Sequence, residues 1–175
     1  MTKAFRGQSG RLPASIRFRP AGDSDLPFLF DLYASTREAE LAQLDWSMEQ
    51  KTDFLKMQFE AQHRYYHEQF PDAEYLVVQQ GDVDIGRVYL HRRPDELRLV
   101  DIALVPQAQN QGLGGKLLKD LLDDAQACSL PVRIHVESYN PAMHLYLRLG
   151  FQNVADQGVY QLMEWRPEGM ENPSN

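Results

Sequence analysis

The sequence predicts an α+β domain, in which one mixed sheet carries helices on both faces in a three-layer α/β arrangement. Three observations support this fold class. Segments with strand-like alternation of apolar residues lie near the start, in the middle and at the end of the chain, and segments with helical apolar spacing lie between them. The resulting order is β, α, α, β, β, β, α, β, α, β, β. The length of 175 residues, with 43% hydrophobic and 25% charged residues, suits one such domain.

The first third of the chain is predicted to hold one strand and two helices. Alternation over 15–19 indicates the strand, and the turn at 21–25 precedes a helix with apolar residues on one face. Pro27 in its first turn is tolerated, because the first amides of a helix have no partner within it. Ser47 and Gln50 form the pattern of a capping box, which starts a second helix that runs to about Glu68.

The middle of the chain is predicted to form three strands, over 74–80, 83–91 and 96–105, joined by turns at 81–82 and 92–95. A helix over 112–128 follows, with a continuous apolar stripe. The remaining elements are a strand over 132–137, a short helix over 141–149, and strands over 151–154 and 158–165. We interpret 1–14 as a mobile leader, 15–166 as the single domain and 167–175 as a tail.

Charge and composition exclude several classes of protein. The net charge is −7, but residues 1–19 hold five basic residues and no acid, so the other 156 residues carry 13 basic and 25 acidic side chains. A body at −12 is a poor non-specific binder of nucleic acid and favours a cationic or neutral partner. No apolar run approaches the roughly 18 residues of a membrane span, and the start lacks a secretory signal. A single cysteine, Cys128, fits a cytoplasmic location.

The segment from Gln109 to Lys116 joins a predicted strand to the helix over 112–128 and contains three glycines in four residues. Glycine allows close approach of a ligand to the backbone, and the start of a helix offers free amides and a positive dipole, so this loop suits a pyrophosphate. Two nucleotide motifs fail here. The dinucleotide fingerprint needs glycine and the phosphate loop needs serine or threonine at position 117, which is Leu117.

A third pattern matches. Gln109-x-x-Gly112-x-Gly114 resembles the acyl-coenzyme A loop, Q/R-x-x-G-x-G/A, of the GCN5-related N-acetyltransferase (GNAT) superfamily. The segment from Asn140 to Phe151, with its Leu-Tyr pair and terminal Leu-Gly-Phe, resembles the second signature of that family. The element order also agrees. The resemblance implies a mostly antiparallel sheet of six to seven strands whose central strands splay apart. It further implies an acyl-CoA-dependent N-acyltransferase that moves acetyl from acetyl-CoA to a primary amine by direct attack in a ternary complex.

The resemblance also implies a binding site for acetyl-CoA as the acyl donor, with no metal. The pantetheine arm is expected in the gap between the strands over 101–105 and 132–137. The loop lacks the arginine or lysine that the family often has there, so phosphate binding is expected from backbone amides, helped by Lys116. The expected acetyl-CoA-binding residues are Ala103, Leu104, Val105, Gln109, Asn110, Gln111, Gly112, Leu113, Gly114, Gly115, Lys116, Asn140 and Tyr146. Asn140 can equally cap the helix that follows it.

Three residues are candidates for catalysis. Tyr146 occupies the position of the family's usual general acid, which protonates the departing thiolate, although an aromatic residue on this helix can also simply pack. His135 stands where one branch of the family has a glutamate, and its intrinsic pKa suits a general base. Glu137 shares the strand face of His135 and can orient it or bind substrate. Asp101 is conspicuous in an apolar run, where we favour structural pairing over catalysis.

The resemblance places the acceptor site around 37–70, where aromatic and acidic residues would suit an amine. The expected partner is therefore a small-molecule or peptide amine, with no nucleic acid and no membrane, and the resemblance also allows a homodimer. The alternative is a non-catalytic acyl-CoA-binding or protein-interaction module of the same fold. A third reading, modification of an RNA-bound substrate, conflicts with the acidic body.

Overall fold

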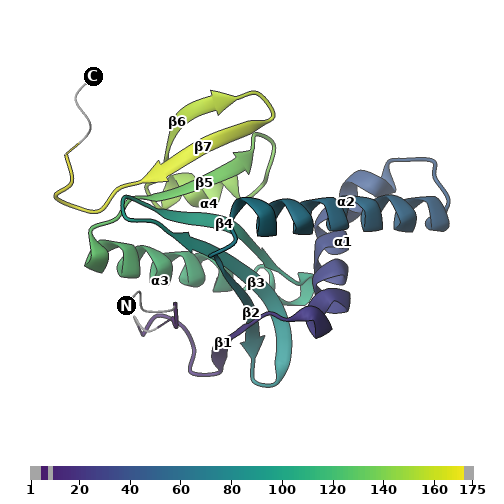
Figure 1. Cartoon of the computed structure of the whole chain (residues 1–175), viewed down its shortest axis with the longest axis horizontal. Helices are drawn as coiled ribbons and strands as arrows, with labels where there is room; N and C mark the ends of the chain where they lie inside the picture. Colours follow the sequence, from purple (N-terminus) through teal and green to yellow (C-terminus); the bar gives the residue numbers. More distant parts are fainter. Residues whose placement is uncertain (1–4, 8–9, 172–175) are drawn as a thin grey trace.

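The computed structural model describes residues 5–7 and 10–171, so parts of the expected leader and tail lie outside the described residues. Within these residues, one seven-stranded sheet runs in the order β1-β2-β3-β4-β5-β7-β6 (Figure 1). Only the β4–β5 pair is parallel; the others are antiparallel. The strands are β1 (Ile16–Pro20), β2 (Glu74–Gln80), β3 (Val83–Arg92), β4 (Leu97–Leu104), β5 (Val132–Glu137), β6 (Gln152–Gln157) and β7 (Tyr160–Trp165).

Helices cover both faces of this sheet, which confirms the predicted fold class (Figure 1). The helices are α1 (Leu26–Ala42), α2 (Met48–Gln69), α3 (Leu113–Cys128) and α4 (Met143–Arg148). The predicted capping box starts α2, because the amide of Gln50 donates to Ser47 Oγ at 3.1 Å and the amide of Ser47 donates to Gln50 Oε1 at 2.9 Å. In the described part of the chain, no helix is both long and apolar enough to cross a membrane.

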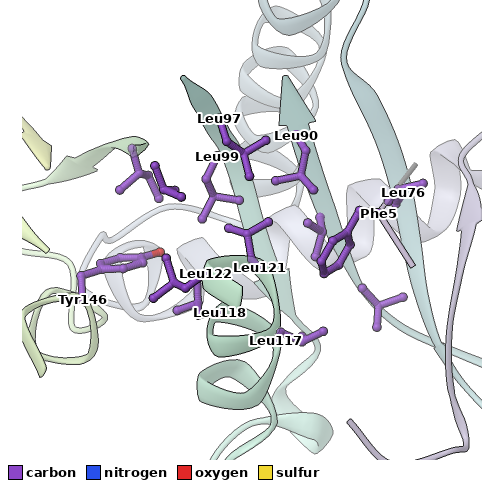
Figure 2. Packing of buried hydrophobic residues seen from close by; sticks show 14 of the residues in the cluster. Phe5, Leu76, Leu90, Leu97, Leu99, Leu117, Leu118, Leu121, Leu122 and Tyr146 are labelled. Atoms are coloured by element: carbon purple, nitrogen blue, oxygen red, sulfur yellow. The ribbon is translucent and has the colours of Figure 1, made fainter. Parts of the chain in front are cut away.

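The main hydrophobic core lies between the sheet and the helices α3 and α4. Figure 2 shows the leucines of α3 facing apolar residues of the central strands, with Phe5 and Tyr146 in the same cluster. Phe5 is only 3% exposed, contacts the ring of Phe18 edge to face at 4.9 Å, and donates its amide to Glu74 Oε2 at 3.0 Å. The expectation of a mobile leader is therefore wrong at Phe5, because the side chain of Phe5 packs in the hydrophobic core. The division into leader, domain and tail otherwise stays a prediction.

The central strands β4 and β5 separate along their length. They pair only at Leu97 with Val132 and at Arg98 with Arg133. Just beyond that point the β3–β4 register shifts, so that Val100 is an extra residue on β4. A bulge of this kind bends its strand and increases its twist. It accounts for the opening between β4 and β5, and the splayed central strands implied by the resemblance are confirmed.

Candidate active site

The β4 side of the opening presents the backbone of Leu104. The amide of Val105 donates to Ile85 O at 2.8 Å, and the carbonyl of Val105 accepts the amide of Ala108 at 2.9 Å. Both main-chain groups of Val105 are thus used inside the protein. Alternate residues of a strand direct their amides to opposite edges. The amide of Ala103 therefore faces β3, like that of Val105, whereas the amide of Leu104 faces the opening. Of these three expected acetyl-CoA-binding residues, Leu104 is the one that offers an N–H there.

The loop before α3 is held together by its own side chains. Gln109 donates from Nε2 to Leu104 O at 2.8 Å, and Gln111 donates from Nε2 to Gln107 O at 2.9 Å. Asn110 and Gly112 both adopt positive φ, of 60° and 76°. Gly112 precedes the first turn of α3 without a side-chain cap, so the amides of that turn have no partner within the helix. The two glutamines therefore fix the loop, and the backbone amides of the first turn of α3 keep no partner within the helix.

The glycines of this loop have open surroundings. A Cβ added at Gly112 would meet nothing within 4 Å, and one added at Gly114 or Gly115 would make only ordinary contacts, of 3.8 and 3.7 Å. Packing within the described protein therefore does not require glycine at these positions. The exposed Lys116 adds a positive charge one turn into the helix. The residues present fit an anionic group close to the backbone.

Tyr146 lies on α4, in the buried cluster that also holds residues of β4 and β5. Its side chain is 4% exposed and its ring contacts that of Phe151 edge to face at 5.5 Å. Burial, and then the negative charge of Asp101, raise the pKa of Tyr146 above its usual value. The phenol is therefore protonated at neutral pH, as a general acid must be. It also packs in the core, so both roles considered for it are compatible.

His135 and Glu137 share one face of β5, opposite the buried Ile134 and Val136, as the alternation predicts. Arg98 Nη1 lies 2.9 Å from His135 Nδ1. A guanidinium only donates, so Nδ1 is the acceptor and the ring is neutral, with its proton on Nε2. Burial and the charge of Arg98 lower the pKa of His135. A base role for His135 stays a prediction, and it would require loss of the Arg98 contact.

Two further candidates, Glu137 and Asn140, also have hydrogen-bond partners. Arg37 of α1 donates to Glu137 Oε1 at 3.3 Å. Asn140 accepts the amide of Ala142 on Oδ1 at 2.9 Å, so it does cap the turn that leads into α4. His135 and Glu137 thus contact different arginines, Arg98 and Arg37. Binding of acetyl-CoA by Asn140 stays a prediction.

A buried network on the α2 side of the sheet joins four residues. Arg87 of β3 is 4% exposed and donates from Nη2 to Asp101 Oδ2 and, at 3.0 Å, to Gln62 Oε1. The hydroxyl of Tyr66 donates to Asp101 Oδ2 at 3.4 Å. The favoured pairing of Asp101 is confirmed. Sequence reasoning missed Arg87, although its signal was available: like Asp101, it is a charged residue inside an apolar strand.

A second network of charged residues lies at the end of the sheet where β4 and β5 still pair. Glu96 is buried and accepts hydrogen bonds from Arg93, Arg98 and Arg133. Arg133 also donates to the buried Glu164. Arg93, in the turn predicted at 92–95, thus contacts a buried carboxylate. These acids, like Asp101 and Glu137, are paired with arginine.

Comparison with known proteins gives a consistent result. The family described as "Acetyltransferase (GNAT) family" matches residues 38–151. A protein of Bacillus subtilis (strain 168), named as a ribosomal protein bS18-alanine N-acetyltransferase, is 32% identical over 95 residues, which is 50% of this chain and 61% of that protein. The match therefore spans less than two thirds of that relative.

Two solved structures show the same fold at lower identity. One is PaiA N-acetyltransferase from Thermoplasma acidophilum in complex with coenzyme A, with a TM-score of 0.66, 18% identity and coverage of 87% of this chain and 99% of that one. The other is YncA from Salmonella typhimurium with acetyl-CoA, with a TM-score of 0.54, 22% identity and coverage of 91% and 98%.

Proposed function

The chain belongs to the GNAT acetyltransferase family, and from this premise we propose that it transfers an acetyl group from acetyl-CoA to a primary amine. The transfer is direct, within a ternary complex. One observation supports the proposal: β4 and β5 separate beyond Arg98, the start of α3 that follows β4 has no side-chain cap, and Tyr146 of α4 is buried in the same cluster as Leu104 and Val136. A phosphate-binding helix start, an amide donor and a proton donor are the groups that thioester transfer requires.

Each group has a separate task in this mechanism. When bound, acetyl-CoA supplies the thioester. The first-turn amides of α3, with Lys116, hold the pyrophosphate, and the Leu104 amide donates to the thioester carbonyl oxygen as negative charge develops there. Tyr146 donates its phenolic proton to the departing sulfur. The exposed Cys128 ends α3, at the opposite end of that helix from the loop, and has no part in the transfer.

The acceptor is proposed to be the amine of a peptide N-terminus or of a small molecule. A peptide is supported by the relative from Bacillus subtilis, whose name gives an alanine of a ribosomal protein as its acceptor. We further propose a cytoplasmic location, on the basis of the single cysteine. A homodimer remains a prediction. The second candidate function, a non-catalytic acyl-CoA-binding module, is favoured only by the contacts of Glu137 with Arg37 and of His135 with Arg98.

The experiment has two parts. Calorimetric titration measures acetyl-CoA binding, and a CoA-release assay measures turnover with two separate acceptors: n-butylamine, and a peptide whose first residue is alanine. We expect binding and turnover by the wild type. Tyr146→Phe should keep the acetyl-CoA affinity and lower kcat by about 10²–10⁴-fold. Tyr65→Phe is the matched control, because Tyr65 is an exposed tyrosine of α2, and it should keep the wild-type rate. Binding without turnover would favour the binding module, and no binding would refute both functions.

A further inference from the structure

We propose that the acceptor is an acidic peptide, whose carboxylates bind Arg93 and Arg133 at the end of the sheet where β4 and β5 still pair. This inference rests on the proposed N-acetyl transfer and names the class of its acceptor. It follows from the position of these arginines, from the burial of the acids beside them, and from the guanidinium donors that remain unused.

A row of paired residues crosses the sheet beside the opening. His91 of β3 lies opposite Arg98 of β4, which is the neighbour of Arg133 on β5. Arg133 in turn lies opposite Glu164 of β7. Paired residues direct their side chains to the same face of a sheet, and Phe70 at the end of α2 contacts the ring of His91 at 5.5 Å. The row therefore lies on the α2 face, where the acceptor is expected.

The acids at this position are buried and fully paired. Glu96 and Glu164 are 2% and 5% exposed. Arg93 donates to Glu96 Oε1 at 2.8 Å, and Arg133 Nη1 donates to Glu96 Oε2 at 3.3 Å. Arg133 Nε donates to Glu164 Oε2 at 2.6 Å, and Arg166 donates to Glu164 Oε1. Each carboxylate oxygen accepts from an arginine, so neither acid is left to bind a cation from solvent.

The arginines outnumber these acids. Four arginines contact the two carboxylates and form what we call the arginine cluster: Arg93, Arg98, Arg133 and Arg166. Two positive charges are thus in excess, within a protein whose net charge is −7. The hydrogen bond with Glu164, and more weakly the charge of the exposed Asp95, raise the pKa of Arg133. Asp95 therefore offsets part of the excess from within electrostatic reach.

Two guanidiniums of the arginine cluster keep donors for a ligand. Nη2 of Arg93 and Nη2 of Arg133 donate to none of the described residues, and neither is a buried polar atom without a partner. The two side chains are 39% and 34% exposed. A guanidinium has donors and no acceptor, so the group that it binds from solvent is an anion.

The same two guanidiniums are held in place before a ligand arrives. Arg93 Nε donates to His91 Nδ1 at 3.2 Å, and its guanidinium carbon lies 5.9 Å from the ring centre of Phe70. Arg133 bridges Glu96 and Glu164. Binding a carboxylate therefore costs little additional side-chain entropy at either arginine.

The distance from the proposed site of transfer favours a peptide over a small molecule. Arg98 precedes Leu104 by six residues on β4, which is roughly 20 Å of strand. An extended peptide spans about 3.3–3.6 Å per residue. The reacting amine and the bound carboxylate are therefore several residues apart, so the acidic residues are expected near the sixth position of the acceptor.

The test compares two hexapeptides that begin with alanine, of which one has glutamate and the other glutamine at positions three to six. CoA release gives kcat/KM for each peptide. We expect the acidic peptide to have a kcat/KM about tenfold higher, through a lower KM. This preference should shrink when the salt is raised from about 0.05 to 0.5 M, because salt screens exposed charges.

Two variants test the residues involved. Arg93→Gln should reduce the preference to about twofold or less, and Glu96 keeps Arg98 and Arg133 as partners in this variant. Asp95→Asn should increase the preference, because it removes an opposing charge. The matched control is Arg17→Gln, which removes an exposed arginine of β1 that pairs with Asp82, and it should leave the preference unchanged.

A binding measurement separates this inference from the proposed function. The N-acetylated forms of the two peptides are titrated calorimetrically in the presence of CoA, and the acidic form should bind about tenfold more tightly. Equal kcat/KM for the two peptides, or a preference that Arg93→Gln leaves intact, would overturn the inference while the transfer stands. A preference for 6-aminohexanoate over n-hexylamine, without one between the peptides, would overturn the peptide. If no acceptor is turned over, the proposed function fails, and the titration alone decides whether the arginine cluster binds acidic peptides.

Discussion

Replacing Gly86 with alanine should strain the sheet at the point where β4 borders the opening. Gly86 of β3 lies opposite Leu104 of β4. A Cβ at this position would lie 2.4 Å from the carbonyl oxygen of Ala103 and 2.8 Å from Leu104 Cδ2. The two strands would have to separate by roughly 0.6 Å to bring the first contact to 3.0 Å. Because that contact is with backbone, no side-chain rotation can relieve it.

The expected cost is moderate. Overpacking costs about 1–3 kcal/mol, and the reduced entropy of the unfolded chain offsets about 0.4–1 kcal/mol of it. A net loss of about 1–2 kcal/mol lowers Tm by roughly 2–8 °C in a chain of this size. The displacement also moves Leu104, whose carbonyl holds the Gln109 side chain at 2.8 Å. If about 1.4 kcal/mol of binding energy is lost with it, the affinity for acetyl-CoA falls about tenfold.

The assay is thermal unfolding followed by circular dichroism, together with calorimetric titration of acetyl-CoA. Gly114→Ala is the matched control, because its Cβ also faces Leu104 but at 3.8 Å. Alanine is favoured over glycine inside a helix by about 0.5–1 kcal/mol, so this control should raise Tm; it is a control for stability alone, because Gly114 is an expected acetyl-CoA-binding residue. An unchanged Tm and affinity for Gly86→Ala would refute the argument that the close approach of β3 positions Leu104.

Three further predictions concern the core, the loop and pH. Phe5→Ala should destabilise the fold by about 3–5 kcal/mol, measured by urea unfolding, and an unchanged midpoint would show that Phe5 is not a core residue. Gln109→Ala should weaken acetyl-CoA binding in the same titration, because the loop loses its bond to Leu104; equal affinity would contradict this. His63, His91 and His135 all have pKa values lowered mainly by burial. The unfolded chain therefore binds protons below about pH 6.5 that the folded state does not, and the free energy of unfolding should fall from about pH 7.5 to about 5.5 rather than stay level.

Much of the fold could be predicted because its signals are local. The apolar stripe of α3, the Ser47–Gln50 capping box and the turn at Gly81 each depend on residues a few positions apart, and each prediction is confirmed. The loop from Gln109 to Gly115 belongs to the same class, since a glycine-rich turn before a helix is a local pattern with a chemical meaning. Its expected contacts with acetyl-CoA remain predictions.

The contacts of the site could not be predicted in the same way, because they join residues far apart in the sequence. Arg87 meets Asp101 only through the register of β3 and β4, and the bulge at Val100 fixes which β4 residue stands at the opening. His135 meets Arg98 because β4 and β5 are parallel neighbours for two residues before they part. A one-residue change in either register would exchange these partners, and no local pattern specifies it.

By itself, the sequence determined the element order, the glycine-rich loop before α3 and the resemblance to an acetyltransferase family, since these depend on short-range periodicity and on motifs. The tertiary structure alone decided which charges neutralise one another. It placed Phe5 in the core, and it paired the carboxylates of Glu96, Asp101 and Glu137 with arginines from distant parts of the chain. The physical reason is that burying a charge requires a partner at contact distance, and strand pairing supplies that partner from a distant part of the chain.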